Sequence, residues 1–321
     1  MGTRKTADHH IPVRFHPGET LKEKMEEMEI SVKEFATRIG KPEQMVLELV
    51  ECRMPVNAEW ALLLEYTTGI EAEFWLTKQS NYDLYRLREG RQAYQKTNHS
   101  WLNILPVSEM IAHHWVEQKE GAAEMVGELL RFFGVVSVEA WENYYFRQKL
   151  RVAFRISLEG TINPYALSTW LRRGEIQAQE TYLDYSYSKK ALKEKMPAIV
   201  QRLLHPTDDI LDVMQQILES LGIKLIYTEP LSGVPIKGAS RWIYGHPCIQ
   251  LPRQVETYPS YSQTLLHELA HIYLHGKKDI FLENVGYIPD SPESYHRKEA
   301  EADEFVRKWL SEERDKEFVA S

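Results

Sequence analysis

Cysteine, long apolar runs and excess positive charge are all scarce in this chain of 321 residues. Its two cysteines, Cys52 and Cys248, lie far apart, which excludes a disulfide framework and fits a reduced, cytoplasmic protein. No apolar run approaches the length of a transmembrane helix and no signal-peptide core is seen at the start, so we expect no membrane partner. The formal net charge of −8 argues against a protein that coats nucleic acid, but it still leaves room for a local basic patch.

The length of the chain predicts two or three domains, and its hydrophobic content of 43% is sufficient to fill their cores. We divide it into an N-terminal domain at 1–98, a helical connecting region at 99–205 and a C-terminal domain at 206–321. The predicted fold class is multidomain and mainly α, with five N-terminal helices and a C-terminal α+β domain.

Residues 265–275 read LLHELAHIYLH and contain an HExxH motif inside an apolar run with helical periodicity. On a helix, His267 and His271 are one turn apart on one face, so both imidazoles can bind one metal ion. Glu268 then lies where it can polarise a water molecule rather than bind the metal. The motif fixes only three positions, and an amphipathic helix that happens to carry two histidines is the alternative.

A third ligand is predicted about thirty residues downstream. A catalytic zinc needs three protein ligands and an open fourth position. Residues 295–310 are rich in Glu, Ala, Lys and Arg, which favour a helix. Glu299 and Asp303 are spaced i, i+4, so one carboxylate can bind the metal while the other holds a ligand imidazole. Glu301 points away from Asp303 and is the second choice as ligand, and His275 is interpreted as a helix-end residue.

Residues 208–310 resemble the ImmA/IrrE metallo-endopeptidase family. The matching motifs are GIKLIYTEPLSGVPIKGASRW at 222–242, IQL at 249–251, HELAHIYLH at 267–275 and ExxADxF at 299–305. The resemblance implies a gluzincin-like α+β fold, a Zn²⁺ cofactor and a protein substrate, since family members are linked to proteolysis of transcriptional repressors. It also implies the site roles: His267, His271 and Glu299 as metal ligands, Glu268 as general base and Asp303 as support. Val306 replaces a frequent alanine of the family, and the leucine-rich LLMP continuation is absent.

In such a mechanism, Glu268 accepts a proton from the attacking water and later returns it to the leaving amine. A donor for the developing oxyanion is also required. The sequence does not choose among the candidates by chain position, which are Tyr258, Tyr261, Tyr287, Tyr295 and His296.

The N-terminal region carries the signals of a helix-turn-helix unit. Ser31 followed by Glu34 is a capping-box pattern that opens a helix closed by Gly40, and Pro42 opens a second helix at 43–50. Two short helices joined by a tight turn are the geometry of this DNA-binding unit. Further helices are predicted at 19–28, at 58–68 and from 71 onward.

Residues 14–90 resemble a HigA-like antitoxin domain of the XRE helix-turn-helix class. The matching motifs are HPGETLKEKMEE at 16–27, SVKEFATRIG at 31–40 and EAEFWLTKQSNYDLYRLRE at 71–89. The resemblance implies a homodimer that binds operator DNA and masks a toxin partner.

The charge of this region conflicts with simple DNA binding. Residues 14–90 contain ten Lys and Arg against fifteen Asp and Glu, a balance of −5, whereas phosphate contacts require basic side chains. Gln44 is the one good reader of base edges on the predicted recognition helix, with Arg38, Lys41 and Arg53 available for phosphates. Operator binding and a module for dimerisation or partner recognition therefore both stay open.

The remaining sequence is less informative. Residues 107–133 predict a helix or a broken pair, and Pro164 opens another helix. Aromatic and basic residues interleave at 141–151 and 170–173, which favours a core face over a stacking platform for single strands. In the C-terminal domain we expect a helix at 208–221, strands near 223–228, 239–244 and 248–251 with His246 in the intervening turn, and a loop with a short strand at 279–292.

The leading hypothesis is a zinc-dependent endopeptidase fused to a helix-turn-helix regulator, which cleaves a protein partner such as a repressor or a toxin–antitoxin component. The rival is a DNA-binding antitoxin-type regulator whose metal domain senses zinc or folds around it without proteolysis. A structural zinc domain used for assembly is a third reading.

Overall fold

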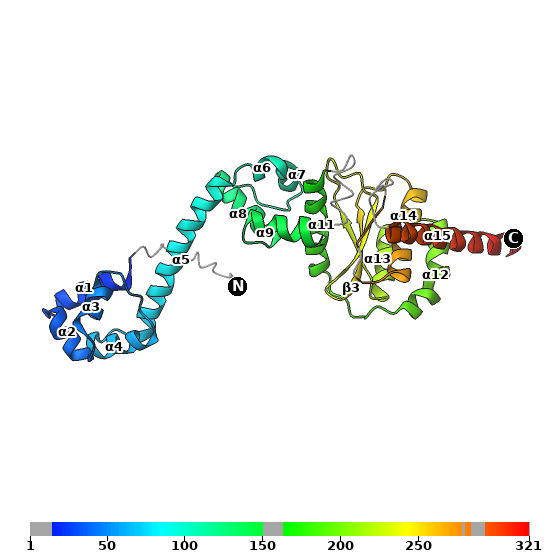
Figure 1. Cartoon of the computed structure of the whole chain (residues 1–321). Coiled ribbons are helices and arrows are strands. Elements are labelled where there is room, and N and C mark those ends of the chain that lie inside the picture. The colour runs from blue at the N-terminus through cyan, green and yellow to red at the C-terminus, as the bar shows by residue number, and fades with distance from the viewer. Residues whose placement is uncertain (1–14, 150–162, 278–279, 284–292, 321) are drawn as a thin grey trace, which may run out of the picture. The chain divides into compact units, whose positions relative to one another are not determined.

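The computed structural model describes residues 15–149, 163–277, 280–283 and 293–320, and the chain separates into two compact units, Met1–Thr97 and Asn98–Ser321 (Figure 1). Within the described residues, no helix is both long and apolar enough to cross a membrane. The protein is mainly helical, with a single mixed sheet of four strands described in the second unit.

The first unit is a bundle of five helices. They are α1 (Pro17–Glu27), α2 (Val32–Ile39), α3 (Glu43–Val50), α4 (Ala58–Thr68) and α5 (Ala72–Thr97). Their apolar faces meet in one core that includes Leu21, Phe35, Val46, Leu49, Trp60, Leu64 and Trp75. The predicted number and order of helices are thus found, and residues 58–68 form α4 as expected.

Local capping residues set the helix ends in the first unit. The Ser31 hydroxyl accepts a hydrogen bond from the Glu34 amide, and Gly40 ends α2 in the left-handed conformation. The reciprocal half of the predicted capping box is absent because the Glu34 carboxylate accepts a hydrogen bond from Arg38 instead. Pro42 is the N-cap of α3 and not its first residue.

The second unit begins with short helices and continues into the sheet. The helical elements before the sheet are α6 (Trp101–Ile104), α7 (Val107–Ala112), α8 (Ala122–Phe133), α9 (Val138–Trp141), the π-helical η1 (Glu142–Lys149), α11 (Pro164–Glu180), α12 (Lys189–Leu204) and α13 (Ile210–Ser220). Residues 107–133 therefore form a broken pair of helices. Trp141, Tyr145 and Trp170 are buried in one core, which supports the core-face interpretation of these aromatic residues.

The sheet contains β1 (Lys224–Thr228), β2 (Gly238–Ile243), β3 (His246–Pro252) and β4 (Phe281–Glu283), in the spatial order β1-β3-β2-β4. β1 runs parallel to β3, whereas β2 is antiparallel to both of its neighbours. Tyr244 and Gly245, both with positive φ, form the two-residue turn between β2 and β3. The placement of His246 in this turn was wrong, because His246 already pairs with Ile243 across the hairpin.

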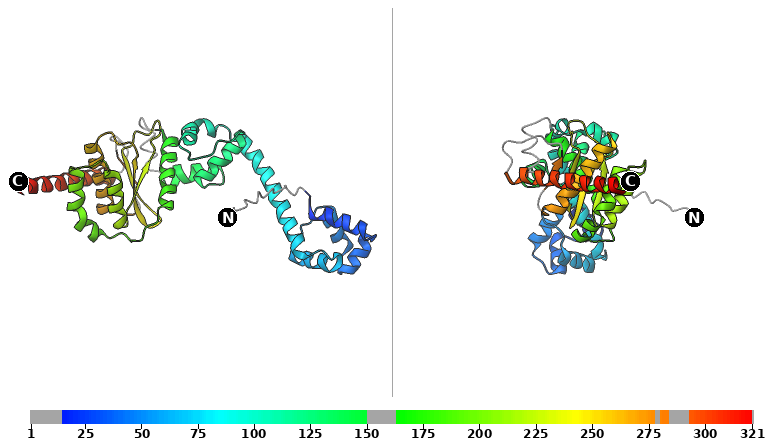
Figure 2. Two further views of the ribbon diagram at one scale, coloured as in Figure 1. Left: turned by 180° about the vertical axis from the view of Figure 1, so that it is seen from behind. Right: turned by 90° about the vertical axis from the view of Figure 1, so that its right-hand side faces the viewer.

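Helices cover both faces of the sheet (Figures 1 and 2). α11 lies on one face, where Ala178 packs with Cys248. The opposite face carries α14 (Tyr258–Leu274), whose Leu265 and Leu269 pack with Ile249 and Leu251. Because successive strand residues point to opposite faces, β3 supplies Cys248 to one layer and Ile249 to the other.

Candidate metal centre

Helix α14 is fixed by capping and by burial. Thr257 caps it through a hydrogen bond from the Ser260 amide to its hydroxyl, and Pro259 lies in the first turn. Leu265, Leu266 and Leu269 are fully buried beneath the sheet. This packing holds the remaining face of the helix, which carries the two histidines of the HExxH motif, against α15 (Glu293–Ala320).

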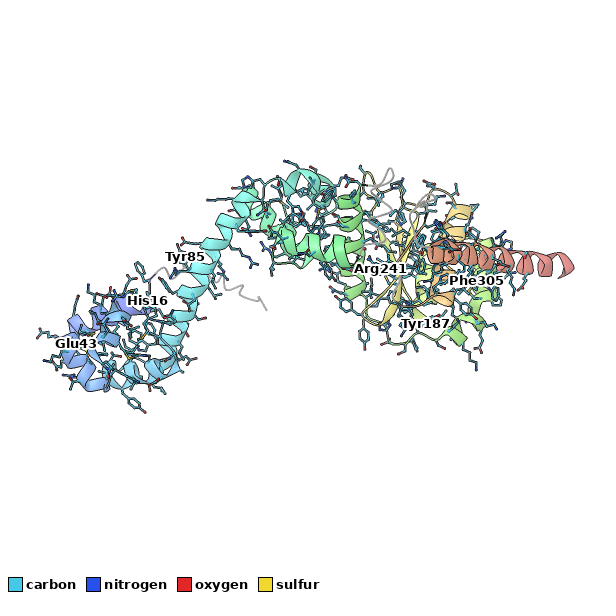
Figure 3. All side chains as sticks on the ribbon, viewed as in Figure 1. His16, Glu43, Tyr85, Tyr187, Arg241 and Phe305 are labelled. Atoms are coloured by element: carbon cyan, nitrogen blue, oxygen red, sulfur yellow. The ribbon has the colours of Figure 1, made fainter. Side chains whose placement is uncertain are left out.

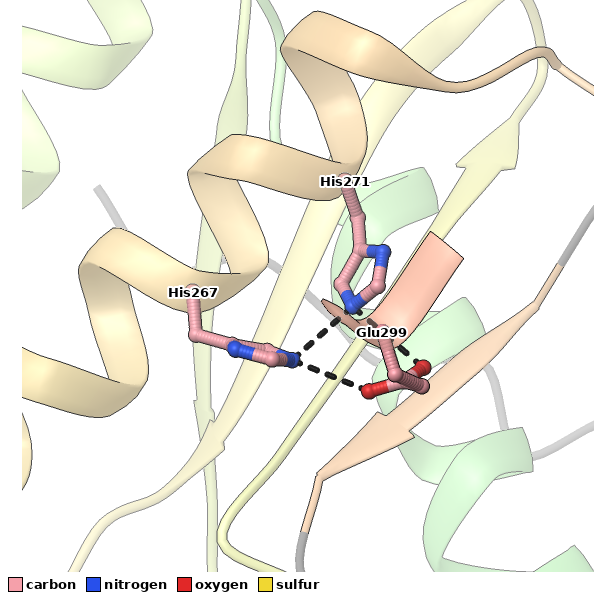
Figure 4. A group of neighbouring side chains, drawn as sticks. All are labelled: His267, His271 and Glu299. Atoms are coloured by element: carbon pink, nitrogen blue, oxygen red, sulfur yellow. Dashed lines mark hydrogen bonds and ion pairs between the residues drawn. The ribbon is translucent and has the colours of Figure 1, made fainter. Parts of the chain in front are cut away.

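The structure brings His267, His271 and Glu299 together as a group that could hold a metal ion (Figure 4). The two imidazole Nε2 atoms lie 3.0 Å apart. Glu299 Oε2 is 3.1 Å from His267 Nε2, and Glu299 Oε1 is 3.5 Å from His271 Nε2. Donors arranged tetrahedrally around zinc at about 2.0–2.1 Å would be about 3.3 Å apart. The three side chains therefore fit one divalent ion.

Asp303 lies one helical turn after Glu299 and contacts the other nitrogen of a candidate ligand. Its Oδ1 is 3.1 Å from His267 Nδ1. A hydrogen bond from Nδ1 to this carboxylate would leave the Nε2 lone pair free to bind an ion held by the group. Glu301, the second choice as ligand, does not join the group, because its Oε2 instead lies 3.2 Å from His275 Nε2.

The strands supply the surroundings of Glu268. Gly238, Ser240, Phe281 and Glu283 share the face of the sheet toward α14, since Gly238 pairs with Glu283 and Ser240 with Phe281. A Cβ at Gly238 would lie 2.9 Å from Glu268 Oε1. Glycine at this position thus leaves the space that the Glu268 carboxylate occupies.

The Glu268 carboxylate is fully buried and has unsatisfied hydrogen-bonding capacity. Neither of its oxygens finds a hydrogen-bond partner among the described residues, and the nearby Ser240 hydroxyl lacks the geometry for one. Burial raises the pKa of Glu268 well above its ordinary value, and the negative charge of Glu283 acts in the same direction. A carboxyl with a raised pKa is a stronger base for taking up a proton.

The three grouped side chains are strongly coupled. Burial opposes charge on Glu299, but the neighbouring imidazoles of His267 and His271 outweigh it and hold the Glu299 pKa at about 2. Burial lowers the His271 pKa to about 4. Burial also disfavours the charged form of His267, yet the hydrogen bond with Glu299 prevails and raises its pKa to about 9. A half-buried negative charge against two buried imidazoles is an environment suited to a cation.

Aromatic rings enclose one side of the group. The Phe281 ring stacks on His271 with a centroid distance of 3.9 Å and an interplanar angle of 11°. The Tyr295 ring also lies near-parallel to that of Phe281, with a centroid distance of 6.0 Å and an interplanar angle of 20°. The sequence did not single out Phe281 or Glu283, because a strand of three residues carries too little periodicity to be recognised.

The structure distinguishes the candidates for an oxyanion donor by the contacts and the exposure of their side chains. The Tyr261 hydroxyl is 2.7 Å from that of Tyr227, Tyr258 is 39% exposed, and Tyr287 lies outside the described residues. Tyr295 is half-buried, but its hydroxyl is buried beside Glu299 and makes no hydrogen bond of good geometry within the described part of the chain. Of the described tyrosines among the candidates, Tyr295 is the one whose hydroxyl has a candidate metal ligand, Glu299, as a neighbour. The fifth candidate, His296, contacts the Tyr295 ring with a centroid distance of 6.3 Å.

The predicted DNA-contacting residues are each engaged with a carboxylate of the same unit. Arg38 pairs with Glu34 at 2.6 Å, Lys41 with Glu59, and Arg53 with Glu51. The Gln44 amide donates to Glu48 at 3.1 Å. Figure 3 shows Glu43 on α3 of the same helix pair. These pairings reduce the positive charge that α2, α3 and their flanks can offer to phosphate.

Part of the second unit matches a known protein family. Residues 218–312 match the IrrE N-terminal-like domain of the M78 peptidases, a segment that contains the whole His267, His271 and Glu299 group. No curated protein matches the chain.

Three solved structures are similar to about a quarter of the chain. An addiction-module antidote protein of the HigA family from Coxiella burnetii is 26% identical, with a TM-score of 0.25, and covers 26% of this chain and 94% of its own. The antitoxin GraA is 32% identical, with a TM-score of 0.24 and coverages of 24% and 84%. A putative antidote protein of a plasmid maintenance system from Nostoc punctiforme is 25% identical, with a TM-score of 0.25 and coverages of 26% and 92%.

Proposed function

We propose that this protein is a zinc-dependent endopeptidase joined to a helix-turn-helix module, and that its substrate is a protein such as a repressor or a toxin–antitoxin component. The observation that carries the proposal is the convergence of His267, His271 and Glu299 beside the buried, unbonded carboxylate of Glu268. The match of residues 218–312 to the IrrE N-terminal-like domain supports the same reaction class.

In this proposal His267, His271 and Glu299 hold the ion, with Asp303 fixing the His267 ring. Zinc, when bound, would polarise the scissile carbonyl and make a water molecule more acidic. Glu268 takes the proton from that water and delivers it to the leaving amine. Tyr295 is the side chain that we assign to the oxyanion.

An open cavity supports a peptide substrate with an apolar side chain near the cleaved bond. The cavity has a volume of about 390 Å³ and is lined by Ile236, Leu251, Val255 and Thr264, among others. Leu251 and Thr264 also surround the Cβ position of Gly238, each at 3.0 Å, next to Glu268 Oε1. The cavity and the surroundings of Glu268 thus share two residues, Leu251 and Thr264.

The test compares the wild type with Glu268→Gln and with Glu304→Gln, an exposed glutamate of α15. Metal analysis of the three full-length proteins should give one zinc per chain in each. Mass spectrometry of proteins encoded beside the gene, after incubation with each enzyme, should show cleavage with the wild type and Glu304→Gln only. Cleavage at the wild-type rate by Glu268→Gln would reject the mechanism.

Operator binding by a homodimer is the second candidate function. The order of α2, the Gly40 turn and α3 favours it, whereas the carboxylate pairing of Arg38, Lys41 and Arg53 opposes it. A DNA-selection experiment followed by anisotropy titration tests this role at several salt concentrations. The regulator reading requires that replacing Arg38, Lys41 and Gln44 abolishes binding and that Glu268→Gln preserves it. If no sequence is enriched, the first unit is better explained as a site for a protein partner such as a toxin.

A further inference from the structure

His275 lies at the C-terminal end of α14, one turn after His271, and its side chain is 4% exposed. Its Nδ1 is 3.0 Å from Nδ1 of His271, and its Nε2 is 3.2 Å from Oε2 of Glu301. Both ring nitrogens thus have polar partners, one on α14 and one on α15. Neither nitrogen belongs to the group of three metal-ligand atoms.

The positions of the protons follow from these partners. His271 presents Nε2 to His267 and Glu299, so a ligand role requires the Nε2 lone pair and leaves the proton on Nδ1. His271 Nδ1–H then donates to Nδ1 of His275. The neutral His275 ring carries its proton on Nε2, which donates to the Glu301 carboxylate. One set of tautomers satisfies the whole chain of contacts.

We propose that His275 and Glu301 form a hydrogen-bonded relay that positions His271 as a metal ligand, a role that rests on the proposed zinc function. Asp303 supports His267 directly, whereas Glu301 supports His271 through an intervening imidazole. Three acidic residues of α15 then have three distinct roles toward α14: Glu299 binds, Asp303 orients one ligand, and Glu301 orients the other.

The same geometry explains why a third histidine on this helix does not close the site. His275 contacts the nitrogen of His271 that faces away from Glu299, and its remaining nitrogen is directed to Glu301. The relay therefore lies on the far side of the His271 ring from the ion position. A fourth coordination position stays available for water or substrate, as a catalytic centre requires.

Loss of such an outer partner typically lowers metal affinity by about 10- to 100-fold. We expect a decrease in this range for His275→Phe, which keeps an aromatic ring against Phe281, 5.1 Å away, but cannot accept the hydrogen bond. His275→Gln offers an amide oxygen to His271 and an N–H to Glu301, so it should regain part of the affinity. Glu301→Gln keeps a hydrogen-bond acceptor but removes the charge, so its zinc affinity should decrease less than that of His275→Phe.

The experiment is a chelator-competition titration with Zn²⁺ on the full-length wild type and these three variants, with Glu304→Gln as the matched control on α15. Absorption spectra with Co²⁺ report the ligand geometry independently of turnover, and His275→Phe should change the cobalt bands. Circular dichroism melts of the metal-free proteins identify a variant that fails to fold. If His275→Phe does not fold, the zinc affinities of His275→Gln and Glu301→Gln are compared with that of the wild type instead.

The outcomes separate the two proposals. A wild type that binds no ion would overturn the proposed zinc function. A wild type that binds zinc, together with folded His275 and Glu301 variants of equal affinity and unchanged cobalt spectra, would overturn the relay alone. Ordered affinities, with the wild type and Glu304→Gln highest, His275→Gln between and His275→Phe lowest, would support it.

Discussion

Two glycine-to-alanine substitutions in helices should change stability in opposite directions. Gly90 in α5 has nothing within 4 Å of an added Cβ, whereas a Cβ at Gly174 in α11 would lie 2.0 Å from Oε1 and 2.5 Å from Nε2 of Gln250. Alanine ordinarily stabilises a helix interior by about 0.5–1 kcal/mol relative to glycine. We expect that gain at Gly90 and a net loss at Gly174.

The size of the loss follows from the bonds that Gln250 makes. Its amide donates to the Trp170 carbonyl at 2.8 Å and to the Thr228 hydroxyl at 3.0 Å, and it accepts from Arg241 at 3.1 Å. Gln250 is 1% exposed, so water does not replace these partners. A buried polar group left unsatisfied costs about 1–3 kcal/mol. Expelling the amide should cost about 3–4 kcal/mol in sum, and the helix gain reduces the net loss to about 2–3 kcal/mol.

The assay is scanning calorimetry of the full chain, with each transition assigned to a unit by hydrogen exchange of its peptides. For a unit of this size, 1 kcal/mol shifts the midpoint by about 2–4 °C. Gly174→Ala should therefore lower the midpoint of the second unit by roughly 4–12 °C, while Gly90→Ala raises that of the first unit slightly. An unchanged or raised midpoint for Gly174→Ala would refute the reasoning, because it would mean that the Gln250 contacts carry no net stability.

Two further predictions concern the second unit, and a third compares one cysteine from each unit. Gly238→Ala should displace the Glu268 carboxylate by several tenths of an ångström, because the added Cβ would lie too close to it. We expect the zinc content to persist and peptide cleavage to fall about tenfold. Unchanged cleavage would show that the Cβ does not displace the carboxylate. Tyr295→Phe should lower kcat by about 10²-fold if its hydroxyl stabilises the oxyanion, with zinc affinity retained. An unchanged kcat with only KM altered would exclude that role. Burial raises the pKa of Cys248 to about 11, so only about one thiol in a thousand is ionised at pH 8. Ellman's reagent should react with the half-buried Cys52 in the native protein and with Cys248 only after denaturant is added; fast native labelling of Cys248 would show that it is accessible.

Elements with strong local signals could be predicted closely from the sequence. Residues 58–68 form α4 because Asn57 caps its start and Gly69 ends it with a positive φ. The strands near 223–228, 239–244 and 248–251 are found within one or two residues of the predicted bounds. Such signals are carried by residues next to one another in the chain, so no tertiary information is needed to recognise them.

Features that depend on contact between distant elements were harder to predict. The i, i+4 spacing of Glu299 and Asp303 indicated a shared face, but the choice between Glu299 and Glu301 as the grouped carboxylate depends on how α15 crosses α14. The contact of His275 with Glu301 is of the same kind, since neither residue has a local signal for the other. Similarly, the predicted turn position of His246 was wrong. The turn is formed by Tyr244 and Gly245, and a positive φ at a tyrosine has no signal in the sequence.

The packing of α11 on one face of the sheet and of α12 against α14 on the opposite side has a practical consequence for working with this protein. Both helices precede residue 218, where the peptidase-like segment begins, yet Trp170 and Ala178 cover one side of the strands and Leu192 and Met196 pack behind α14. An expression fragment limited to the matching segment would contain every candidate metal ligand. It would also expose the apolar surfaces of the sheet and of α14 that these two helices cover in the full chain. Any minimal version of the metal centre must therefore begin upstream of Pro164.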